Sequence, residues 1–517
     1  MSETRFSEPI IMRDGVKLST IIIKPKDDIT LPVFLIRTPY SAKKKYNIGK
    51  TLAEKLNSIF VLQDTRGRYD SEGDFNVLDE KNDTLDTINW IKKQSWFNGG
   101  LHIFGASYLG YVGLQVLDDD SANIHTMFAP MIFNPSDSIY RGGVLQLHWA
   151  LPWSIMTSTK VQASLTYIND VWPAAYDITY QKDLKNAVKN LGWPDQIWKF
   201  FTIPTTDSTW DKFRIKSNKE LSTKVCLVGG WFDFLLNGTF TTYDELMNRG
   251  GVKPDLIIGP WSHNGYLASQ AGVRDWDFGK DGAGNFIQDL MSFIDRYKNN
   301  GNQMIKVFIQ QANKWMDLDS WPPGNVIEQR YYLQENQVLS DTRLTDELVE
   351  LSFKAEMNNP VPTLGGLVWE SYEPVEPGPV DQSPLKQRDD ILKFYTKEFD
   401  QNTTFLGLAL VELWVKTIVP ETHFTAKLVV VDSEGKERIF QDGILKVLGP
   451  LSNYKLITID LIATGIEIKK GEQIGLEVSW SNFPKFALPP LTTNSLQKLA
   501  LAKNMSSVLK LSKLNKF

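Results

Sequence analysis

Residues 102–117 of the chain read HIFGASYLGYVGLQVL, and this stretch is the most informative one about the fold. It begins with a short apolar segment, passes through a turn flanked by Gly105 and Gly110, and continues with apolar residues at helical spacing. Strand, sharp turn and helix in this order are the context in which a serine is held exposed above a sheet. Ser107 is therefore the candidate nucleophile. The alternative is an N-cap serine on an ordinary strand–helix turn, because the spacing G-x-S-x-x-G alone is a weak motif in a chain with 35 glycines.

Short segments of strand-forming residues recur on both sides of this turn. Each has an apolar interior flanked by polar residues, glycine or proline, and they are residues 33–37, 59–63, 102–105, 125–130, 224–229 and 255–259. Leu85, Ile88 and Ile91 recur between them at helical spacing. Short buried strands that alternate with helices predict an α/β fold with a doubly wound, mostly parallel sheet. We expect residues 1–135 and 222–325 to form this catalytic domain.

Two further regions have different patterns. Residues 136–221 hold tryptophans among helix formers, including Trp149, Trp153, Trp172, Trp193 and Trp198. They predict a helical cap inserted between two strands of the sheet. Residues 326–517 contain period-two segments such as 391–396, 409–417 and 424–432, which predict an all-β jelly-roll sandwich. The tail 506–514, SSVLKLSKL, is predicted as its last strand, with a basic amphipathic membrane helix as the alternative.

Composition excludes several classes of protein. The chain has 517 residues, with 42% hydrophobic and 23% charged residues, which is typical of globular domains. Its net charge of −5 favours neither nucleic acid nor an anionic membrane as a partner. Cys226 is the one cysteine, so neither a disulfide framework nor a thiolate metal site is expected. The first ten residues, MSETRFSEPI, contain no apolar leader, and we expect a soluble cytoplasmic protein.

A serine nucleophile needs a base and a group that orients the base. His263 is the candidate base because it follows the strand at 255–259, in the loop GPWSHNG (259–265). Asp233 follows the preceding strand, in WFDF, and is the candidate acid. The rival acid Asp255 opens its strand and so lies at the wrong edge of the sheet. Ser107, Asp233 and His263 thus satisfy the chain order and the strand-end placement of an α/β-hydrolase triad.

The oxyanion formed in such a reaction needs hydrogen-bond donors. The backbone N–H of Tyr108, directly after the nucleophile, is the first candidate. The loop after the strand at 33–37 reads Thr38-Pro39-Tyr40-Ser41 and lacks a glycine-rich run that could offer backbone donors. The phenol of Tyr40 is therefore the second candidate, with a buried structural tyrosine as the equal alternative.

The assembled residues lie within longer stretches that resemble the cocaine esterase / α-amino acid ester hydrolase / X-Pro dipeptidyl-peptidase group of α/β-hydrolases. The stretches that carry the resemblance are MRDGVKLST (12–20), RTPY (37–40), QDTRGRYDSEGDF (63–75), GASYLG (105–110), GGWFDFLLNGT (229–239), GPWSHNG (259–265), NPVPTLGG (359–366), GPVDQSPLKQRDDILKFYT (378–396) and HFTAKLVVVD (423–432). They span nearly the whole chain, and QDTRGRYDSEGDF together with GASYLG is highly specific.

The resemblance implies a role for each matching residue. Ser107 matches the nucleophile of the group, Asp233 and His263 match its triad partners, and Tyr40 with the Tyr108 amide matches its oxyanion donors. It also implies a helical cap, a C-terminal jelly roll and an acyl pocket where the three parts meet.

Three aromatic residues, Trp149, Trp153 and Phe234, are candidate substrate-binding residues of that pocket, with packing as the alternative. We expect the charged residues of QDTRGRYDSEGDF, Arg66, Arg68, Asp70 and Glu72, to be structural.

Two departures from the group bear on specificity. Phe234-Leu235-Leu236 is more apolar than the small residues expected after the triad acid, and His423 stands where an aspartate is usual. Activity on dipeptides or amino esters requires carboxylates aimed at an ammonium group, for which Asp137 and Asp170 are the candidates. The sequence therefore favours a serine esterase or acylase acting on moderately apolar acyl groups.

The alternatives are an X-Pro dipeptidyl-peptidase or α-amino acid ester hydrolase, an acyltransferase and a non-catalytic binding scaffold. The expected partner is a small ester, amide or short peptide substrate, and the chain's aromatic content is compatible with a homo-oligomer. No His/Asp/Glu cluster has ligand spacing, so neither a metal nor a cofactor is expected.

Overall fold

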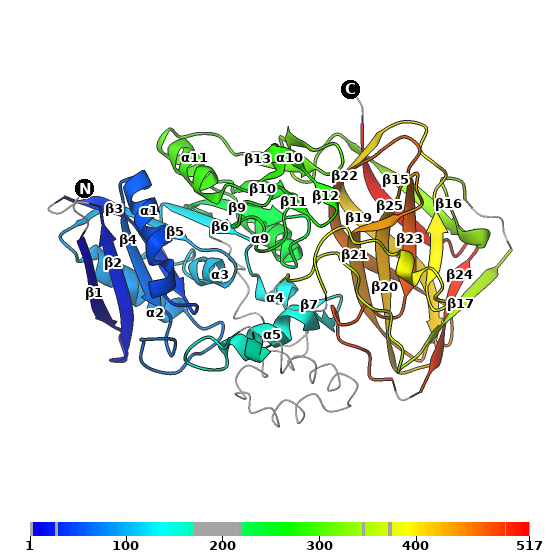
Figure 1. Ribbon diagram of the computed structural model, residues 1–517, viewed down its shortest axis with the longest axis horizontal. Coiled ribbons are helices and arrows are strands. Elements are labelled where there is room, and N and C mark those ends of the chain that lie inside the picture. The colour runs from blue at the N-terminus through cyan, green and yellow to red at the C-terminus, as the bar shows by residue number, and fades with distance from the viewer. Residues whose placement is uncertain are drawn as a thin grey trace.

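The fold was analysed in a computed structural model, which describes residues 4–25, 29–164, 166–168, 210, 217, 219–343, 347–370, 375–491 and 493–515 (Figure 1). Two large sheets follow one another along the longest axis of the molecule. The first is ten-stranded and carries the N-terminal half of the chain, and the second is eleven-stranded and begins at Val326.

The ten-stranded sheet has the order β1-β2-β4-β3-β5-β6-β9-β10-β13-β14. Its strands are β1 (Thr4–Ile11), β2 (Lys17–Lys24), β3 (Leu31–Thr38), β4 (Ile59–Asp64), β5 (Phe97–Phe104), β6 (Thr126–Pro130), β9 (Lys224–Gly230), β10 (Asp255–Gly259), β13 (Ile305–Ile309) and β14 (Lys314–Asp317). The strands from β4 to β13 run parallel, whereas β1, β2 and β14 add antiparallel edges. This arrangement confirms the predicted doubly wound, mostly parallel sheet and adds edge strands that the sequence did not predict.

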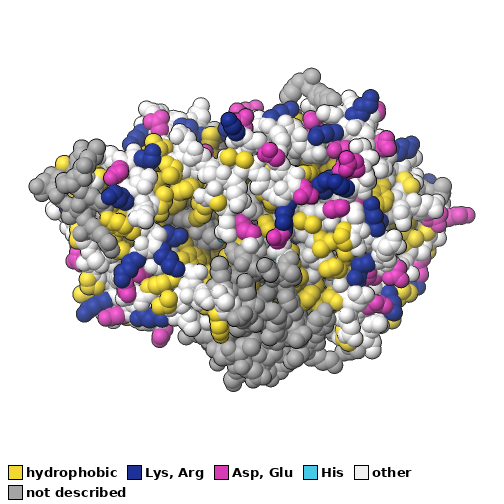
Figure 2. Space-filling view, viewed as in Figure 1, with side chains coloured by type: hydrophobic (Ala, Val, Ile, Leu, Met, Phe, Trp, Pro, Cys, Tyr) yellow, Lys and Arg dark blue, Asp and Glu magenta, His cyan; other side chains and the backbone are white. Residues whose placement is uncertain are grey.

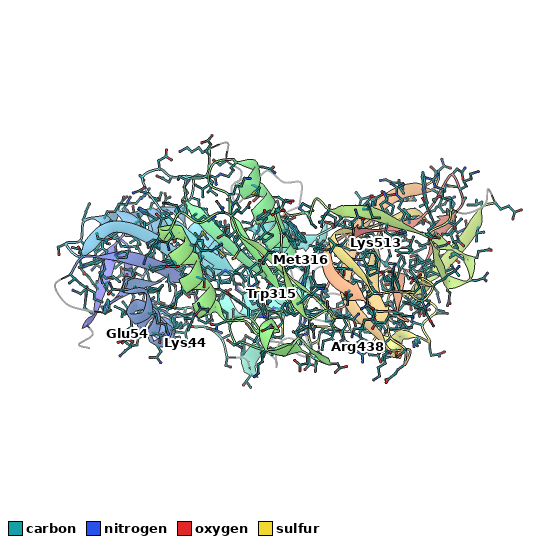
Figure 3. The ribbon with its side chains drawn as sticks, turned by 90° about the horizontal axis from the view of Figure 1, so that it is seen from above. Lys44, Glu54, Trp315, Met316, Arg438 and Lys513 are labelled. Carbon is teal, nitrogen blue, oxygen red and sulfur yellow. The ribbon has the colours of Figure 1, made fainter. Side chains whose placement is uncertain are left out.

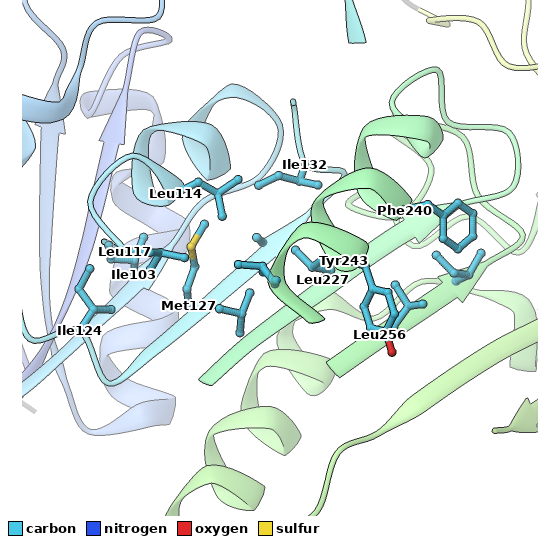
Figure 4. Close-up of a cluster of buried hydrophobic side chains, with 14 of the residues drawn as sticks. Ile103, Leu114, Leu117, Ile124, Met127, Ile132, Leu227, Phe240, Tyr243 and Leu256 are labelled. Carbon is cyan, nitrogen blue, oxygen red and sulfur yellow. The ribbon is translucent and has the colours of Figure 1, made fainter. Parts of the chain in front are cut away.

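Helices cover both faces of this sheet. Helices α1 (Tyr46–Leu56) and α11 (Phe286–Lys298) pack on one face through residues such as Leu52 and Phe293. Helices α2 (Lys81–Lys92), α3 (Tyr108–Leu114) and α9 (Leu236–Asn248) pack on the other. Figure 4 shows Leu114 of α3 and Tyr243 of α9 above the strands that carry Met127 and Leu227. Continuous apolar strands are stable here because both of their faces are buried.

The described part of the segment predicted as a cap starts after β6. It contains α4 (Pro135–Ser138), a small hairpin of β7 (Tyr140–Arg141) and β8 (Val144–Leu145), and α5 (Leu147–Thr157). The hairpin was not predicted, and its turn uses Gly142 and Gly143, both at positive φ. Helix α5 is buried all round. Trp172, Trp193, Trp198 and Asp170 lie outside the described residues.

The second sheet is entirely antiparallel apart from one parallel contact between β16 and β18. Its strands are β15 (Val326–Gln334), β16 (Val338–Ser340), β17 (Val349–Ala355), β18 (Leu392–Tyr395), β19 (Thr403–Thr417), β20 (Glu421–Val431), β21 (Glu437–Leu448), β22 (Lys455–Ile468), β23 (Gln473–Ser479), β24 (Ser495–Leu501) and β25 (Val508–Leu514). Alternating residues of these strands face a common apolar core, as in β19, whose buried residues recur with period two. The predicted tail strand is β25, which lies between β15 and β19.

Short elements complete the described part of the chain. They are η1 (Lys43–Lys45), β11 (Gly272–Val273), β12 (Trp276–Asp277), α10 (Gly279–Gly282), η3 (Glu335–Gln337) and η4 (Ser383–Leu385). Charged side chains of both signs are interspersed on the face viewed in Figure 2. Among the helices of the described residues, none has the length and apolar character needed to span a membrane.

Contacts at two places hold the second sheet against the first part of the chain. Gln310, just after β13, donates its backbone N–H to the carbonyl of Gly465 in β22 at 2.9 Å. Near the hairpin of β7 and β8, Arg141 and Lys485 share the buried carboxylate of Asp442. Lys485 Nζ lies 2.6 Å from Asp442 Oδ1, and Arg141 Nη1 lies 3.1 Å from the same oxygen. The segment after β6 is thereby held against the second sheet.

Candidate active site

Ser107 sits in the turn between β5 and α3, with φ 57° and ψ −128°. A positive φ is strained for a residue with a Cβ, and such strain concentrates at functional sites. The turn is held in place because the Ser107 N–H donates to the carbonyl of Pro130 at 3.0 Å. The conformation sets the serine apart from an ordinary N-cap, and its side chain makes no capping hydrogen bond.

Gly105 and Gly110 explain the spacing of the motif. A Cβ at Gly105 would lie 2.4 Å from the carbonyl oxygen of Leu109, and a Cβ at Gly110 would lie 2.7 Å from the carbonyl oxygen of Gly105. A Cβ at Gly110 would also lie 2.4 Å from Ile132 Cδ1. The strand end and the first helical turn therefore approach too closely for any side chain at either position. The second glycine of G-x-S-x-x-G, three residues after the serine, is therefore required for packing.

His263 and Asp233 meet at the carboxyl ends of neighbouring strands. Asp233 follows β9 and His263 follows β10, and the Nδ1 of His263 lies 2.8 Å from Oδ1 of Asp233. Both side chains are buried. With Nδ1–H donating to the carboxylate, Nε2 of the imidazole is left as the proton acceptor. Asp255 lies at the start of β10, where it pairs with Lys224 at 2.9 Å and with Arg296, so it takes no part in this site.

Burial and the neighbouring charges act on the pKa of His263 in opposite directions. Burial lowers the pKa of His263, whereas the charge and hydrogen bond of Asp233 and the charge of Glu370 raise it, and the net pKa is above the ordinary histidine value. Glu370 comes from the loop after β17. Its Oε1 accepts a hydrogen bond from Ser262 Oγ at 2.8 Å and another from the Asn264 N–H. Glu370 therefore holds the loop that carries the histidine from both sides of it.

Tyr40 lies after β3 with its hydroxyl in a defined orientation. The indole N–H of Trp153, in α5, donates a hydrogen bond to Tyr40 Oη at 2.7 Å. Burial raises the pKa of Tyr40 to about 12, so the phenol stays protonated at neutral pH. Because the phenolic oxygen already accepts from Trp153, its own hydrogen is available to donate elsewhere.

Arg68 holds the backbone next to Tyr40 and the end of α5, the helix that carries Trp153. Its buried guanidinium donates to the carbonyl of Pro39, next to Tyr40, and to the carbonyl of Thr157 at the end of α5, each at 3.0 Å. The other charged residues of the same motif act at a distance from the site. Arg66 pairs with Asp83 and Asp14 at 2.7 and 2.8 Å, and Asp70 pairs with Lys43. The geometry agrees with a structural role for these residues.

Ser107 and His263 line the same cavity, whose volume is about 280 Å³. Tyr40, Tyr108, Trp149, Trp153 and Phe234 line it as well, and its remaining walls are Lys45, Ala106, Leu109, Phe133, Met156, Gln162, Leu235, Asn264, Leu267 and Trp369. The structure thus brings all the predicted site residues except Asp233 to the wall of one cavity, and Asp233 lies behind the imidazole of His263. The phenol of Tyr108 has a separate, structural task, because it accepts the N–H of Leu78 at 3.0 Å.

The aromatic walls of the cavity contact one another. The ring of Phe234 lies 4.7 Å from that of His263, 5.5 Å from Trp149 and 5.6 Å from Trp369, measured between centroids. Trp153 packs against Tyr108 at 5.5 Å. Such a cluster binds apolar groups and keeps the imidazole in a low-dielectric setting.

Sequence reasoning missed three residues at this site. Trp369 and Glu370 come from the loop after β17, about 100 residues beyond His263, and their only signal was their position directly after the motif NPVPTLGGLV. Lys45 follows Tyr40 by five residues in η1 and lines the cavity. Of the predicted ammonium-binding carboxylates, Asp137 lies in α4 and is not among the lining residues. Asp170 is outside the described part of the chain.

The remaining histidines have other surroundings. His102 Nδ1 lies 2.8 Å from Thr126 Oγ1, and His102 stacks on Phe34. His148 Nε2 lies 3.1 Å from the carbonyl oxygen of Trp369. His423, which departs from the family pattern, is buried in β20, and burial lowers its pKa.

Comparisons with known proteins point to one group. The model of the X-Pro dipeptidyl-peptidase (S15 family) matches residues 14–265, and that of the X-Pro dipeptidyl-peptidase C-terminal non-catalytic domain matches residues 300–508. The cocaine esterase of Rhodococcus sp. (strain MB1 Bresler) is 27% identical over 535 residues, which cover 92% of this chain and 90% of the esterase.

Solved structures show the same fold. An aminopeptidase from a marine sediment archaeon, Thaumarchaeota archaeon, superposes with a TM-score of 0.86 at 22% identity, covering 99% of this chain and 97% of the aminopeptidase. An α-amino acid ester hydrolase superposes with a TM-score of 0.80 at 20% identity, covering 99% and 96% of the two chains. The resemblance seen in the sequence motifs is thus confirmed in family and in fold.

Proposed function

Since this chain belongs to the X-Pro dipeptidyl-peptidase (S15) family of α/β-hydrolases and is a serine hydrolase, we propose that it cleaves carboxylic esters through an acyl-enzyme on Ser107. One observation carries the proposal: Ser107 in its strained turn lines one cavity together with His263, whose imidazole is paired with Asp233. The geometry supports esters of moderately apolar acids as the substrate class.

The proposed reaction has two halves. In the first, Ser107 Oγ attacks the carbonyl carbon while its proton passes to Nε2 of His263, and Asp233 stabilises the imidazolium. The C–O bond to the alcohol then breaks, and the alcohol leaves with the proton from His263. In the second half, a water molecule gives a proton to His263 and attacks the acyl carbon. The acid is released, and the proton returns to Ser107.

The negative charge that develops on the carbonyl oxygen requires donors fixed in advance. We assign this task to the hydroxyl of Tyr40 and the backbone N–H of Tyr108. The hydrogen bond from Trp153 supports the assignment of Tyr40, because it fixes the phenolic oxygen and leaves the hydroxyl hydrogen to donate. The raised pKa of Tyr40 also supports it, because a phenolate could not donate.

The chemistry of the cavity supports an apolar acyl group over an amino-acyl group. Trp149, Trp153, Phe234 and Trp369 form much of its wall, and no aspartate or glutamate is among the described residues that line it. A free α-ammonium group in a substrate would need such a carboxylate. We therefore place an ester without a free ammonium group ahead of an N-terminal dipeptide or an α-amino ester as the substrate.

Two measurements test the proposal. A fluorophosphonate probe should label the wild-type enzyme and fail to label the Ser107→Ala variant, and unchanged labelling of that variant would show that another serine is the nucleophile. The value of kcat/KM should be greater for p-nitrophenyl butyrate than for Gly-Pro-p-nitroanilide. The reverse order would make dipeptide release the main activity.

A further inference from the structure

Lys45 is a cation in the wall of the catalytic cavity. It ends η1, five residues after the oxyanion candidate Tyr40, and lines the cavity together with Ser107 and His263. Its side chain is half-buried, whereas those of Lys43 and Lys44 in the same turn are exposed. The proposed hydrolysis gives Lys45 no task, because neither proton transfer nor the oxyanion requires a second cation.

The ammonium of Lys45 has no counter-charge among the described residues. No hydrogen bond or ion pair joins its side chain to another described residue, whereas the neighbouring Lys43 pairs with Asp70 at 2.7 Å. Burial and the charge of Lys44 lower the pKa of Lys45, so the site disfavours its charged form. A partly desolvated ammonium without a partner is unfavourable until an anion binds beside it.

The other charges at the cavity do not serve as that anion. Asp233 is fully buried behind the imidazole of His263 and is not among the lining residues. Glu370 accepts hydrogen bonds from Ser262 and Asn264 and is likewise not a lining residue. Lys45 is therefore the one residue of permanent charge among the described residues that line the cavity.

We infer that the substrate of this enzyme carries a carboxylate or a similar single anionic group, which binds the ammonium of Lys45 while the ester carbonyl lies at Ser107. This inference rests on the proposed function and narrows its substrate class. The anion belongs either to the acyl part or to the alcohol part of the ester, because Lys45 lines the cavity that receives both. A substrate with a free ammonium group is repelled by the same residue.

Matched ester pairs test the inference. The first pair carries the charge on the acyl part: the mono-p-nitrophenyl ester of adipic acid is compared with its terminal amide. The second pair carries it on the alcohol part: 3-carboxyphenyl butyrate is compared with 3-carbamoylphenyl butyrate. In at least one pair we expect kcat/KM to be about tenfold or more higher for the carboxylate, which is the scale of one charge-assisted hydrogen bond.

Variants of the two adjacent lysines show whether Lys45 causes the preference for the carboxylate ester over its amide. Lys45→Met should bring the carboxylate-to-amide ratio close to one, chiefly by lowering kcat/KM for the carboxylate esters, because only these make an ion pair. Lys45→Arg should retain much of the preference. Lys44→Met is the matched control, since Lys44 lies in the same turn but is exposed at the outer edge of the molecule (Figure 3), and it should leave the ratio unchanged.

Binding to the Ser107→Ala variant separates this inference from the proposed function. By calorimetry, the carboxylate ester of at least one pair should bind that variant about tenfold more tightly than its amide, and adding Lys45→Met should remove the difference. Equal binding and equal kcat/KM within both pairs, or a ratio that survives Lys45→Met, would overturn the inference. If the carboxylate esters bind preferentially but the wild-type enzyme does not hydrolyse them, the proposed esterase function fails and the anion site stands.

Discussion

The indole N–H of Trp153 donates a hydrogen bond to the hydroxyl oxygen of Tyr40 at 2.7 Å, and so connects a helix beyond β6 to the loop after β3. Arg68 ties the same two segments together through the carbonyls of Pro39 and Thr157. The phenol thus has a fixed oxygen and a free hydrogen. Its orientation depends on contacts from three separate parts of the chain.

Removing the Tyr40 hydroxyl tests it as an oxyanion donor. Tyr40→Phe should lower kcat by about 10²–10³-fold with little change in KM, because the lost interaction is made in the transition state. Steady-state kinetics with p-nitrophenyl butyrate measure the effect. Tyr297→Phe, on a tyrosine that contacts His102 and His125 and does not line the cavity, should leave kcat unchanged. Normal turnover by Tyr40→Phe would remove the phenol from the mechanism.

The hydrogen bond from Trp153 should be detectable by a double-mutant cycle. Trp153→Phe keeps an aromatic wall but loses the N–H donor, and we expect kcat to fall by about tenfold, which corresponds to one hydrogen bond. In the Tyr40→Phe background the same substitution should cost much less, because its target is gone. Equal losses in the two backgrounds would show that Trp153 acts only through packing in the cavity.

The pH dependence of kcat/KM reports on His263. The base must be neutral to accept a proton, and its pKa is raised, so activity should increase with pH through a midpoint above the ordinary histidine pKa of about 6.5. Glu370→Gln keeps an acceptor for Ser262 and Asn264 but removes a negative charge. It should therefore move the midpoint to lower pH. Glu356→Gln, in an exposed pair with Lys354, should not move it, and an unchanged midpoint in Glu370→Gln would limit Glu370 to holding the loop.

The close approach of Gly105 and Gly110 predicts a strict requirement for glycine. Gly110→Ala places a Cβ against the Gly105 carbonyl and Ile132, and should destabilise the protein by about 1–3 kcal/mol while slowing fluorophosphonate labelling of Ser107. Denaturant unfolding and labelling rates measure the two effects. Gly324→Ala is the control, because a Cβ there meets nothing within 4 Å. Wild-type behaviour of Gly110→Ala would mean that the turn relaxes easily.

The buried ionic cluster at the second sheet predicts a large stability effect. Asp442→Asn leaves the buried cations Arg141 and Lys485 without their carboxylate, and should lower the free energy of unfolding by about 3–5 kcal/mol. Asp432→Asn removes a carboxylate from a more exposed pair with Arg438, and should cost at most about 1 kcal/mol. Chemical denaturation measures the free energy of unfolding of both variants. Similar losses of this free energy in the two would contradict a large contribution of the buried cluster to stability.

The sequence predicted the sheet well because its strands are continuous apolar runs. Segments such as 59–63 and 255–259 appear in the structure as β4 and β10, and the period-two pattern of 409–417 lies within β19. The edge strands β1 and β14 were not predicted, because β14 has only four residues and most of the residues of β1 are exposed or half-buried, so neither has a clear apolar pattern. The hairpin of β7 and β8 is only two residues per strand, which is too short for any periodicity.

The site was predictable where its residues follow strands of one sheet. Ser107, Asp233 and His263 share one edge because parallel strands end there, and chain order then selects them. Trp369 and Glu370 could not be found in this way, because they meet Phe234 and Ser262 only through tertiary contacts, which no local pattern encodes. Lys45 was overlooked because a lysine among three consecutive lysines resembles a solvated surface.

The loop that carries His263 is held by Glu370, which belongs to the part of the chain that forms the second sheet. A fragment that ends before Glu370 would keep Ser107, Asp233 and His263 but would lose the acceptor for Ser262 and Asn264. The second sheet is therefore not a separable appendage of the first, because it anchors the loop of the candidate base.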